Sequence, residues 1–132
     1  MLHGAVADAK ALKGYLEEVI RVPEDQIRTL LDEEATRNAV IMAFRDLRVD
    51  QRIHNGDPII IFYAGHGSEL PPPHAWGIHG KIQCLLPYDY NPTGLYPIYP
   101  IPDRSIGALI EDIAKTKGDN IVSEEPTSFP PF

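Results

Sequence analysis

The sequence predicts an α/β fold in which amphipathic helices pack against a small parallel sheet. Residues 59–63 form an unbroken β-branched and aromatic run, which is typical of a central strand covered on both faces. Apolar residues recur at helical spacing in residues 4–21 and 36–48. A shorter apolar segment at residues 26–31 lies between these helices, so strand, helix and strand follow one another. That order predicts a βαβ unit, whose crossover is almost always right-handed.

The first helix is predicted at residues 4–21 and therefore begins almost at the first residue. One stripe of this helix holds its apolar side chains, which are Ala5, Ala9, Leu12, Leu16 and Val19 or Ile20. A turn signal at residues 22–25 follows. The strand predicted at residues 26–31 has imperfect alternation and takes its apolar content from Ile27, Leu30 and Leu31.

Thr36 is expected to cap the second helix, which extends to about Arg48. Its buried stripe consists of Val40, Ile41, Phe44 and Leu47. The turn Asn55-Gly56-Asp57 then leads into the central strand at residues 59–63.

Residues 71–102 are interpreted as a long ordered segment between the central strand and the third helix, because they combine eight of the thirteen prolines with Trp76 and several tyrosines. A short strand is predicted within it at residues 81–86. Asp103 is expected to cap a third helix that stops at Gly118. One face of this helix carries Ile106, Leu109, Ile110 and Ile113.

The chain of 132 residues is predicted to hold one domain at residues 1–121, followed by a disordered tail at residues 122–132 with three prolines and no periodicity. Its net charge of −7 and the lack of any basic run argue against a nucleic-acid partner. No apolar stretch approaches the roughly 20 residues of a membrane span, and the first residues do not resemble a signal peptide. We therefore expect a cytoplasmic protein without a membrane partner.

His66 stands between Gly65 and Gly67 directly after the central strand. The carboxyl ends of strands are where open α/β sheets place their chemistry. An imidazole titrates near neutral pH and can transfer protons in both directions, while Gly67 offers an unhindered backbone N–H. These groups suit the base and the oxyanion donor of a cysteine protease. The alternative is that His66 only terminates a strand.

Cys84 is the only cysteine, so an internal disulfide is excluded and no other thiol can serve as nucleophile. Its apolar neighbours favour an inert buried thiol over an activated one. A zinc site from His66, His74, His79 and Cys84 matches none of the usual ligand spacings. Asp89 alone falls short of the oxygen-rich cluster that calcium requires. We therefore expect neither a metal nor another cofactor.

Residues 59–68, Ile-Ile-Ile-Phe-Tyr-Ala-Gly-His-Gly-Ser, resemble the caspase and metacaspase family of cysteine endopeptidases, particularly the caspase-domain proteins of fungi. Other segments resemble family elements in the same order: residues 2–9 the first helix, 23–27 the second strand, 84–90 the segment after the histidine, and 101–103 with 118–121 the third helix. The resemblance covers about 120 of the 132 residues.

This resemblance implies a three-layer caspase-like (caspase-hemoglobinase) sandwich, polypeptide substrates, and proteolysis of the kind used in programmed cell death. It assigns the catalytic base to His66 and an oxyanion-hole N–H to Gly67. Family members place one strand before the first helix and another, ending at the nucleophilic cysteine, after the third. Neither strand is expected here, since residues 122–132 replace the second, so we expect an incomplete fold of marginal stability. No acidic calcium-binding cluster is evident between His66 and Tyr90.

Two functions follow from these observations. By resemblance the chain is part of a cysteine endopeptidase domain, inactive by itself because His66 has no thiolate to activate. A longer caspase-like chain is then its expected partner. The alternative is a non-catalytic caspase-like module with an interaction or regulatory role.

Overall fold

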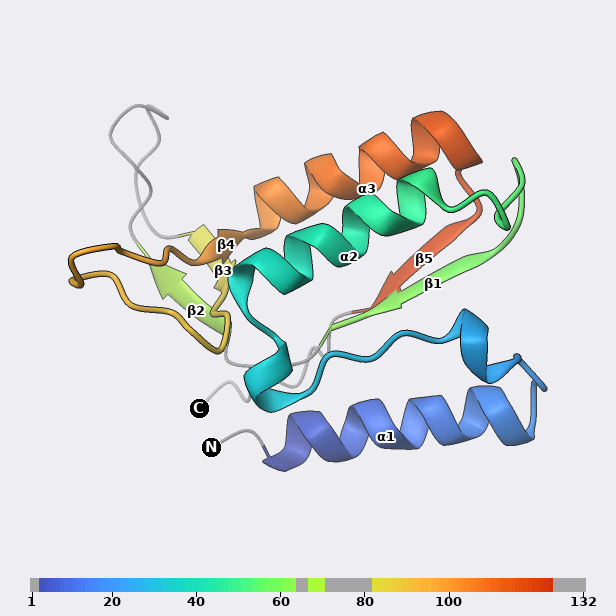
Figure 1. Cartoon of the computed structure of the whole chain (residues 1–132), viewed down its shortest axis with the longest axis horizontal. Helices are drawn as coiled ribbons and strands as arrows, with labels where there is room; N and C mark the ends of the chain where they lie inside the picture. The colour runs from blue at the N-terminus through green and yellow to red at the C-terminus, as the bar shows by residue number, and fades with distance from the viewer. Residues whose placement is uncertain (1–2, 64–66, 71–81, 125–132) are drawn as a thin grey trace.

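The computed structural model describes residues 3–63, 67–70 and 82–124 of the chain (Figure 1). Its helices and strands are α1 (His3–Glu18), α2 (Arg37–Val49), β1 (Ile59–Phe62), β2 (Gly67–Leu70), β3 (Ile82–Leu85), β4 (Ile101–Pro102), α3 (Asp103–Lys117) and β5 (Ile121–Glu124). Two short 3₁₀ turns, η1 (Glu24–Gln26) and η2 (Asp32–Glu34), lie between α1 and α2. None of the helices in these ranges is both long and apolar enough to cross a membrane.

The strands form two separate sheets. β1 pairs in parallel with β5, in a register that places Ile59 opposite Ile121 and Phe62 opposite Glu124. β2, β3 and β4 form an antiparallel sheet in which Gly67 lies opposite Leu85 and Leu85 lies opposite Ile101. In Figure 1, α2 and α3 lie together on one side of β1 and β5, while α1 runs along the other side of the molecule. This arrangement agrees with the predicted three-layer α/β fold.

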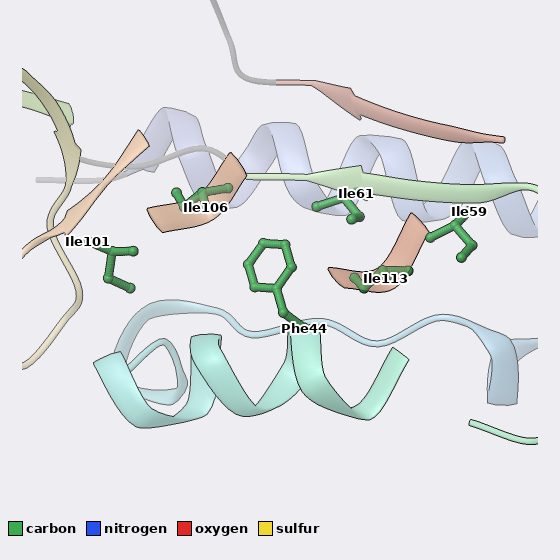
Figure 2. Close-up of a cluster of buried hydrophobic side chains, with 6 residues drawn as sticks. All are labelled: Phe44, Ile59, Ile61, Ile101, Ile106 and Ile113. Atoms are coloured by element: carbon green, nitrogen blue, oxygen red, sulfur yellow. The ribbon is translucent and has the colours of Figure 1, made fainter. Parts of the chain in front are cut away.

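The hydrophobic core lies between β1 and the helices α2 and α3 (Figure 2). Its buried side chains are Phe44, Ile59, Ile61, Ile101, Ile106 and Ile113. Ile101 and Ile113 are each only 1% exposed, and full burial of a side chain of this size stabilises a fold by roughly 1.5–3 kcal/mol. The three predicted helices are confirmed, and the apolar stripes predicted for α2 and α3 supply their core residues.

The ends of α2 and α3 follow from local chemistry. Thr36 is the N-cap of α2, as predicted, because its hydroxyl accepts a hydrogen bond from the Ala39 N–H at 3.2 Å. Asp103 was expected to cap α3 but is the first helical residue instead; Pro102 holds the cap position without a side-chain bond. Gly118 ends α3 as predicted, with a φ of 89° that favours glycine.

The strand predicted at residues 26–31 is not present. Gln26 ends η1, and the backbone beyond it is extended at Ile27 and Leu31 but belongs to no sheet within the described part of the chain. An extended segment becomes a strand only when a neighbouring backbone pairs with it, and apolar content alone does not supply that neighbour. The βαβ unit predicted from residues 26–31, the second helix and residues 59–63 is therefore wrong for the described residues.

The expectation that β1 is central and covered on both faces is also wrong for the described residues. β1 pairs only with β5, and its side chains alternate between buried and accessible. Ile60 is 52% exposed and its register partner Val122 is 51% exposed, so these two side chains lie on an open face. A continuous apolar run indicates a strand but does not by itself show that both faces are covered.

β5 corrects the prediction that residues 122–132 form an irregular tail. Val122, Ser123 and Glu124 continue the strand that begins at Ile121, so the predicted boundary after residue 121 falls inside β5. A strand therefore follows the third helix, where none was expected. The sequence gives only a weak signal for it, because four residues are too few to display a period and pairing with β1 supplies the backbone partners. Residues 125–132 lie outside the described residues.

Candidate active-site edge of the sheet

The carboxyl ends of β1 and β5 lie at one edge of their sheet. The two strands are parallel, and Phe62 at the end of β1 lies opposite Glu124 at the end of β5. His66 follows Phe62 by four residues but lies outside the described residues, so its predicted role as a base is untested. The chain leaves both strands at the edge where open α/β sheets place functional groups.

Gly67, the second predicted site residue, is the first residue of β2. Its register partner is Leu85 on β3, and Leu85 is in turn the partner of Ile101 on β4. Gly67 is therefore held at the end of an antiparallel sheet by its backbone. Its predicted role as an oxyanion donor stays a prediction.

A buried lysine fixes the opposite end of the β1–β5 pair. The Lys117 ammonium donates hydrogen bonds to the carbonyl oxygens of Asp50 at 2.7 Å and Ile53 at 2.8 Å, and the residue is only 9% exposed. A buried ammonium is costly unless its donors are satisfied, and the two carbonyls accept hydrogen bonds from two of its three N–H groups. Lys117 thereby joins the end of α3 to the loop that leads from α2 into β1.

A second set of hydrogen bonds aligns the starts of β1 and β5. The Gly56 N–H donates to the Lys117 carbonyl at 2.8 Å, and the Ile59 N–H donates to the Asn120 carbonyl at 3.0 Å. The Asn120 amide nitrogen donates back to the Gly56 carbonyl at 3.1 Å. Because the starts of the strands are fixed in this way, their carboxyl ends reach the same edge.

Lys117 and Asn120 were not singled out by the sequence. A lysine in the last turn of a helix usually faces solvent and complements the helix dipole. The turn Asn55-Gly56-Asp57 was the one available signal, because a tight turn before β1 requires partners for its backbone groups.

Asp89 has a structural role in the segment that follows β3. Its carboxylate accepts a hydrogen bond from the Arg37 N–H at 2.9 Å, at the first turn of α2. The Tyr88 N–H donates to the Ala35 carbonyl at 2.9 Å and holds the same segment in place. A carboxylate at a helix N-terminus is favourable because it faces unsatisfied N–H groups and the positive end of the dipole.

The described residues contain no group of three or more His, Cys, Asp or Glu residues arranged to hold a metal ion. Three of the four residues considered as zinc ligands, His66, His74 and His79, lie outside the described residues. The fourth, Cys84, lies on β3 and is only 3% exposed.

The environment of Cys84 disfavours a thiolate. Burial raises the pKa of the Cys84 thiol, and the carboxylate of Asp103 raises it further by repelling a negative sulfur. A nucleophilic cysteine has the opposite surroundings, with a lowered pKa and access to solvent. The structure therefore agrees with the interpretation of Cys84 as a buried structural thiol.

Comparisons with known proteins point to one family. The family model of the caspase domain matches residues 1–115. Metacaspase-2 of Arabidopsis thaliana is 30% identical over 115 residues, which are 83% of this chain and 26% of that protein. Metacaspase-3 of Arabidopsis thaliana is 28% identical over 99 residues, which are 70% of this chain and 27% of that protein.

The chain spans about a quarter of the length of the curated relatives that it matches. No solved structure matches it. The caspase-domain model nevertheless covers most of the chain, including α1, α2, β1 and most of α3. This chain therefore belongs to the caspase-domain family.

Proposed function

We propose that the chain carries the catalytic histidine and the oxyanion donor of a cysteine endopeptidase site that acts on polypeptides. Membership of the caspase-domain family supports this, as does the parallel β1–β5 pair, whose carboxyl ends share one edge. His66 comes four residues after the end of β1 in the sequence, and Gly67 begins β2. In this proposal His66 is the proton carrier and Gly67 is the oxyanion donor.

The chemistry assigned to these residues is peptide-bond hydrolysis in two steps. A cysteine thiolate attacks the carbonyl carbon of the substrate while the His66 imidazolium holds the thiol proton. The Gly67 N–H donates to the oxygen that becomes negatively charged. His66 then gives its proton to the departing amine, and water, deprotonated by the same imidazole, releases the acyl group from sulfur.

We further propose that this chain does not hydrolyse peptides by itself. The observation that carries this proposal is the burial of Cys84, the single thiol of the sequence, beside Asp103 with a raised pKa. Loss of a nucleophile typically lowers the rate by several powers of ten. Activity would then require a cysteine supplied by a longer caspase-like chain.

The direct test is hydrolysis of a mixture of fluorogenic peptides by the wild-type chain, by Cys84→Ser and by His66→Ala. We expect no hydrolysis above the buffer rate for any of the three. Hydrolysis by the wild type that disappears in both variants would contradict the proposal, because it would make Cys84 and His66 a working dyad.

A second experiment tests the histidine side of the site. β5 ends at Glu124, opposite Phe62, and His66 follows Phe62 by four residues in the sequence. We therefore place a thiol just after β5 with Glu125→Cys, Pro126→Cys or Thr127→Cys, each in a Cys84→Ser background. We expect iodoacetamide to label at least one of these thiols faster than Ser123→Cys, the control within β5, and the advantage to vanish with His66→Ala. Equal labelling with and without His66 would instead favour the alternative, a non-catalytic caspase-like module.

A further inference from the structure

A hollow of about 380 Å³ opens between α2 and α3. It is lined by Phe44, Arg45 and Arg48 of α2 and by Leu109 and Asp112 of α3. The two helices run side by side in the same direction, which brings these residues together (Figure 1). A volume of this size lies in the range of small-molecule pockets, roughly 300–1,000 Å³.

Beside its charged side chains, the hollow is lined by two apolar residues, Phe44 and Leu109. Phe44 is only 7% exposed, and its ring points into the core toward β1 (Figure 2). Leu109 is half-buried and packs against the same core. An apolar group that enters the hollow would therefore be partly removed from water against Leu109.

The rim of the hollow carries two unpaired cations. Within the described part of the chain, the guanidinium groups of Arg45 and Arg48 have neither an ion pair nor a hydrogen bond, although both side chains are exposed. Arg28 and Arg52 differ, because they pair with Asp46 and Asp50. Two uncompensated guanidinium groups side by side in a chain of net charge −7 are a local positive site.

Asp112 lowers the positive charge of this site. With Arg45 and Arg48 positive and Asp112 negative, the lining residues carry a net charge of +1. A guanidinium matches the planar geometry of a carboxylate through two parallel hydrogen bonds. A dianion such as phosphate would gain from both arginines but would also be repelled by Asp112.

We infer that this hollow binds a small organic carboxylate, a monoanion whose apolar body lies against Leu109 and whose charge faces Arg45 and Arg48. The inference does not depend on the peptidase proposal, because it uses none of the residues of that site. The ion pairs are open to water and therefore weak, so we expect dissociation constants on the order of 1 mM.

The test is an NMR titration of the whole chain with phenylacetate, with backbone amide shifts as the readout. We expect saturable shifts in α2 and α3 near the hollow. Acetate lacks the apolar body and phenylacetamide lacks the charge, so each should bind more weakly. Phenyl phosphate carries a second negative charge, which both arginines attract and Asp112 repels.

Variants decide which residues are responsible. Arg48→Gln should weaken phenylacetate binding about fivefold, the effect of losing one exposed ion pair. Asp112→Asn should strengthen phenylacetate binding, and it should strengthen the binding of phenyl phosphate even more. Lys10→Gln is the matched control, because it removes the same charge from an exposed position on α1 and should change nothing.

The inference is overturned by any of three results. These are the lack of a saturable shift with phenylacetate, equal affinity for phenylacetate and phenylacetamide, and equal weakening by Arg48→Gln and Lys10→Gln. All variants change exposed side chains, so folding is not at risk; unchanged spectra away from α2 and α3 would confirm this.

Discussion

The ammonium group of Lys117 donates a hydrogen bond to the carbonyl of Ile53 at 2.8 Å, although 64 residues separate the two in the sequence. With its second bond to the Asp50 carbonyl, Lys117 links the end of α3 to the segment that enters β1. The only charged residue that is buried in the described part of the chain thus acts as a connection between two parts of the fold.

Lys117→Met should therefore destabilise the protein markedly. The variant keeps most of the apolar stem but leaves two carbonyls without their donor, which we expect to cost about 3 kcal/mol in the free energy of unfolding. Urea denaturation measures the change. Lys115→Met is the control, because Lys115 is exposed on the same helix turn, and its ion pair with Glu111 contributes at most about 0.5 kcal/mol. Similar losses in both variants would contradict a specific role for Lys117.

Gly118→Ala should destabilise the protein, and Gly107→Ala should not. Gly118 has a φ of 89°, and a Cβ there would lie 3.0 Å from the Gly56 nitrogen. We expect a loss of about 1–3 kcal/mol, from the unfavourable backbone angle and the displaced turn. Gly107 is a helical position with open space around its Cα, so alanine should add about 0.5–1 kcal/mol of stability. Thermal unfolding of both variants tests these opposite signs.

Deprotonation of Cys84 should lower the free energy of unfolding at alkaline pH. Its folded-state pKa is raised above the ordinary thiol value of 9.0, so the folded chain holds the thiol proton more tightly than the unfolded chain does. This contribution is fully present below pH 9 and is lost as the pH rises through the higher folded pKa. Unfolding free energies from pH 8 upward should decline less steeply in Cys84→Ala than in the wild type. Parallel slopes would mean that Cys84 is not buried as described.

Asp50 should titrate at unusually low pH. Its carboxylate accepts hydrogen bonds from the side chain and the backbone N–H of Arg52, which lower the pKa of Asp50 from 3.8 to about 2. The stabilising contribution is present above pH 4 and is lost as the pH falls through the folded pKa. An NMR titration of the carboxyl carbon should show this value in the wild type. In Arg52→Gln it should move back toward 3.8.

Helix positions could be predicted from the sequence because their signals are local. Thr36 caps α2, Gly118 ends α3, and apolar residues at helical spacing mark the sides that face the core. β1 and β3 could likewise be located from their apolar runs.

Strand pairing was less predictable, because it depends on residues far away in the sequence. Residues 26–31 have strand-like content but no partner within the described part of the chain, whereas Val122 has weak signals and pairs with Ile60. The candidate site shows the same division. The position of Gly67 after a predicted strand could be read from the sequence. The hydrogen bonds of Lys117 and Asn120, which align β1 with β5, could not, because they join segments that lie far apart in the sequence.

The order of the strands has a mechanical consequence for the two sheets. The chain passes from one sheet to the other between β1 and β2, through residues 63–66, and returns between β4 and β5 through α3. α3 has 15 residues and is therefore about 22 Å long. β4 of one sheet directly precedes it, and β5 of the other sheet follows it. Only four residues of sequence, 63–66, separate β1 from β2. The two sheets are thus joined by a long straight helix and by one short connection, and any tilt of α3 changes the separation between them.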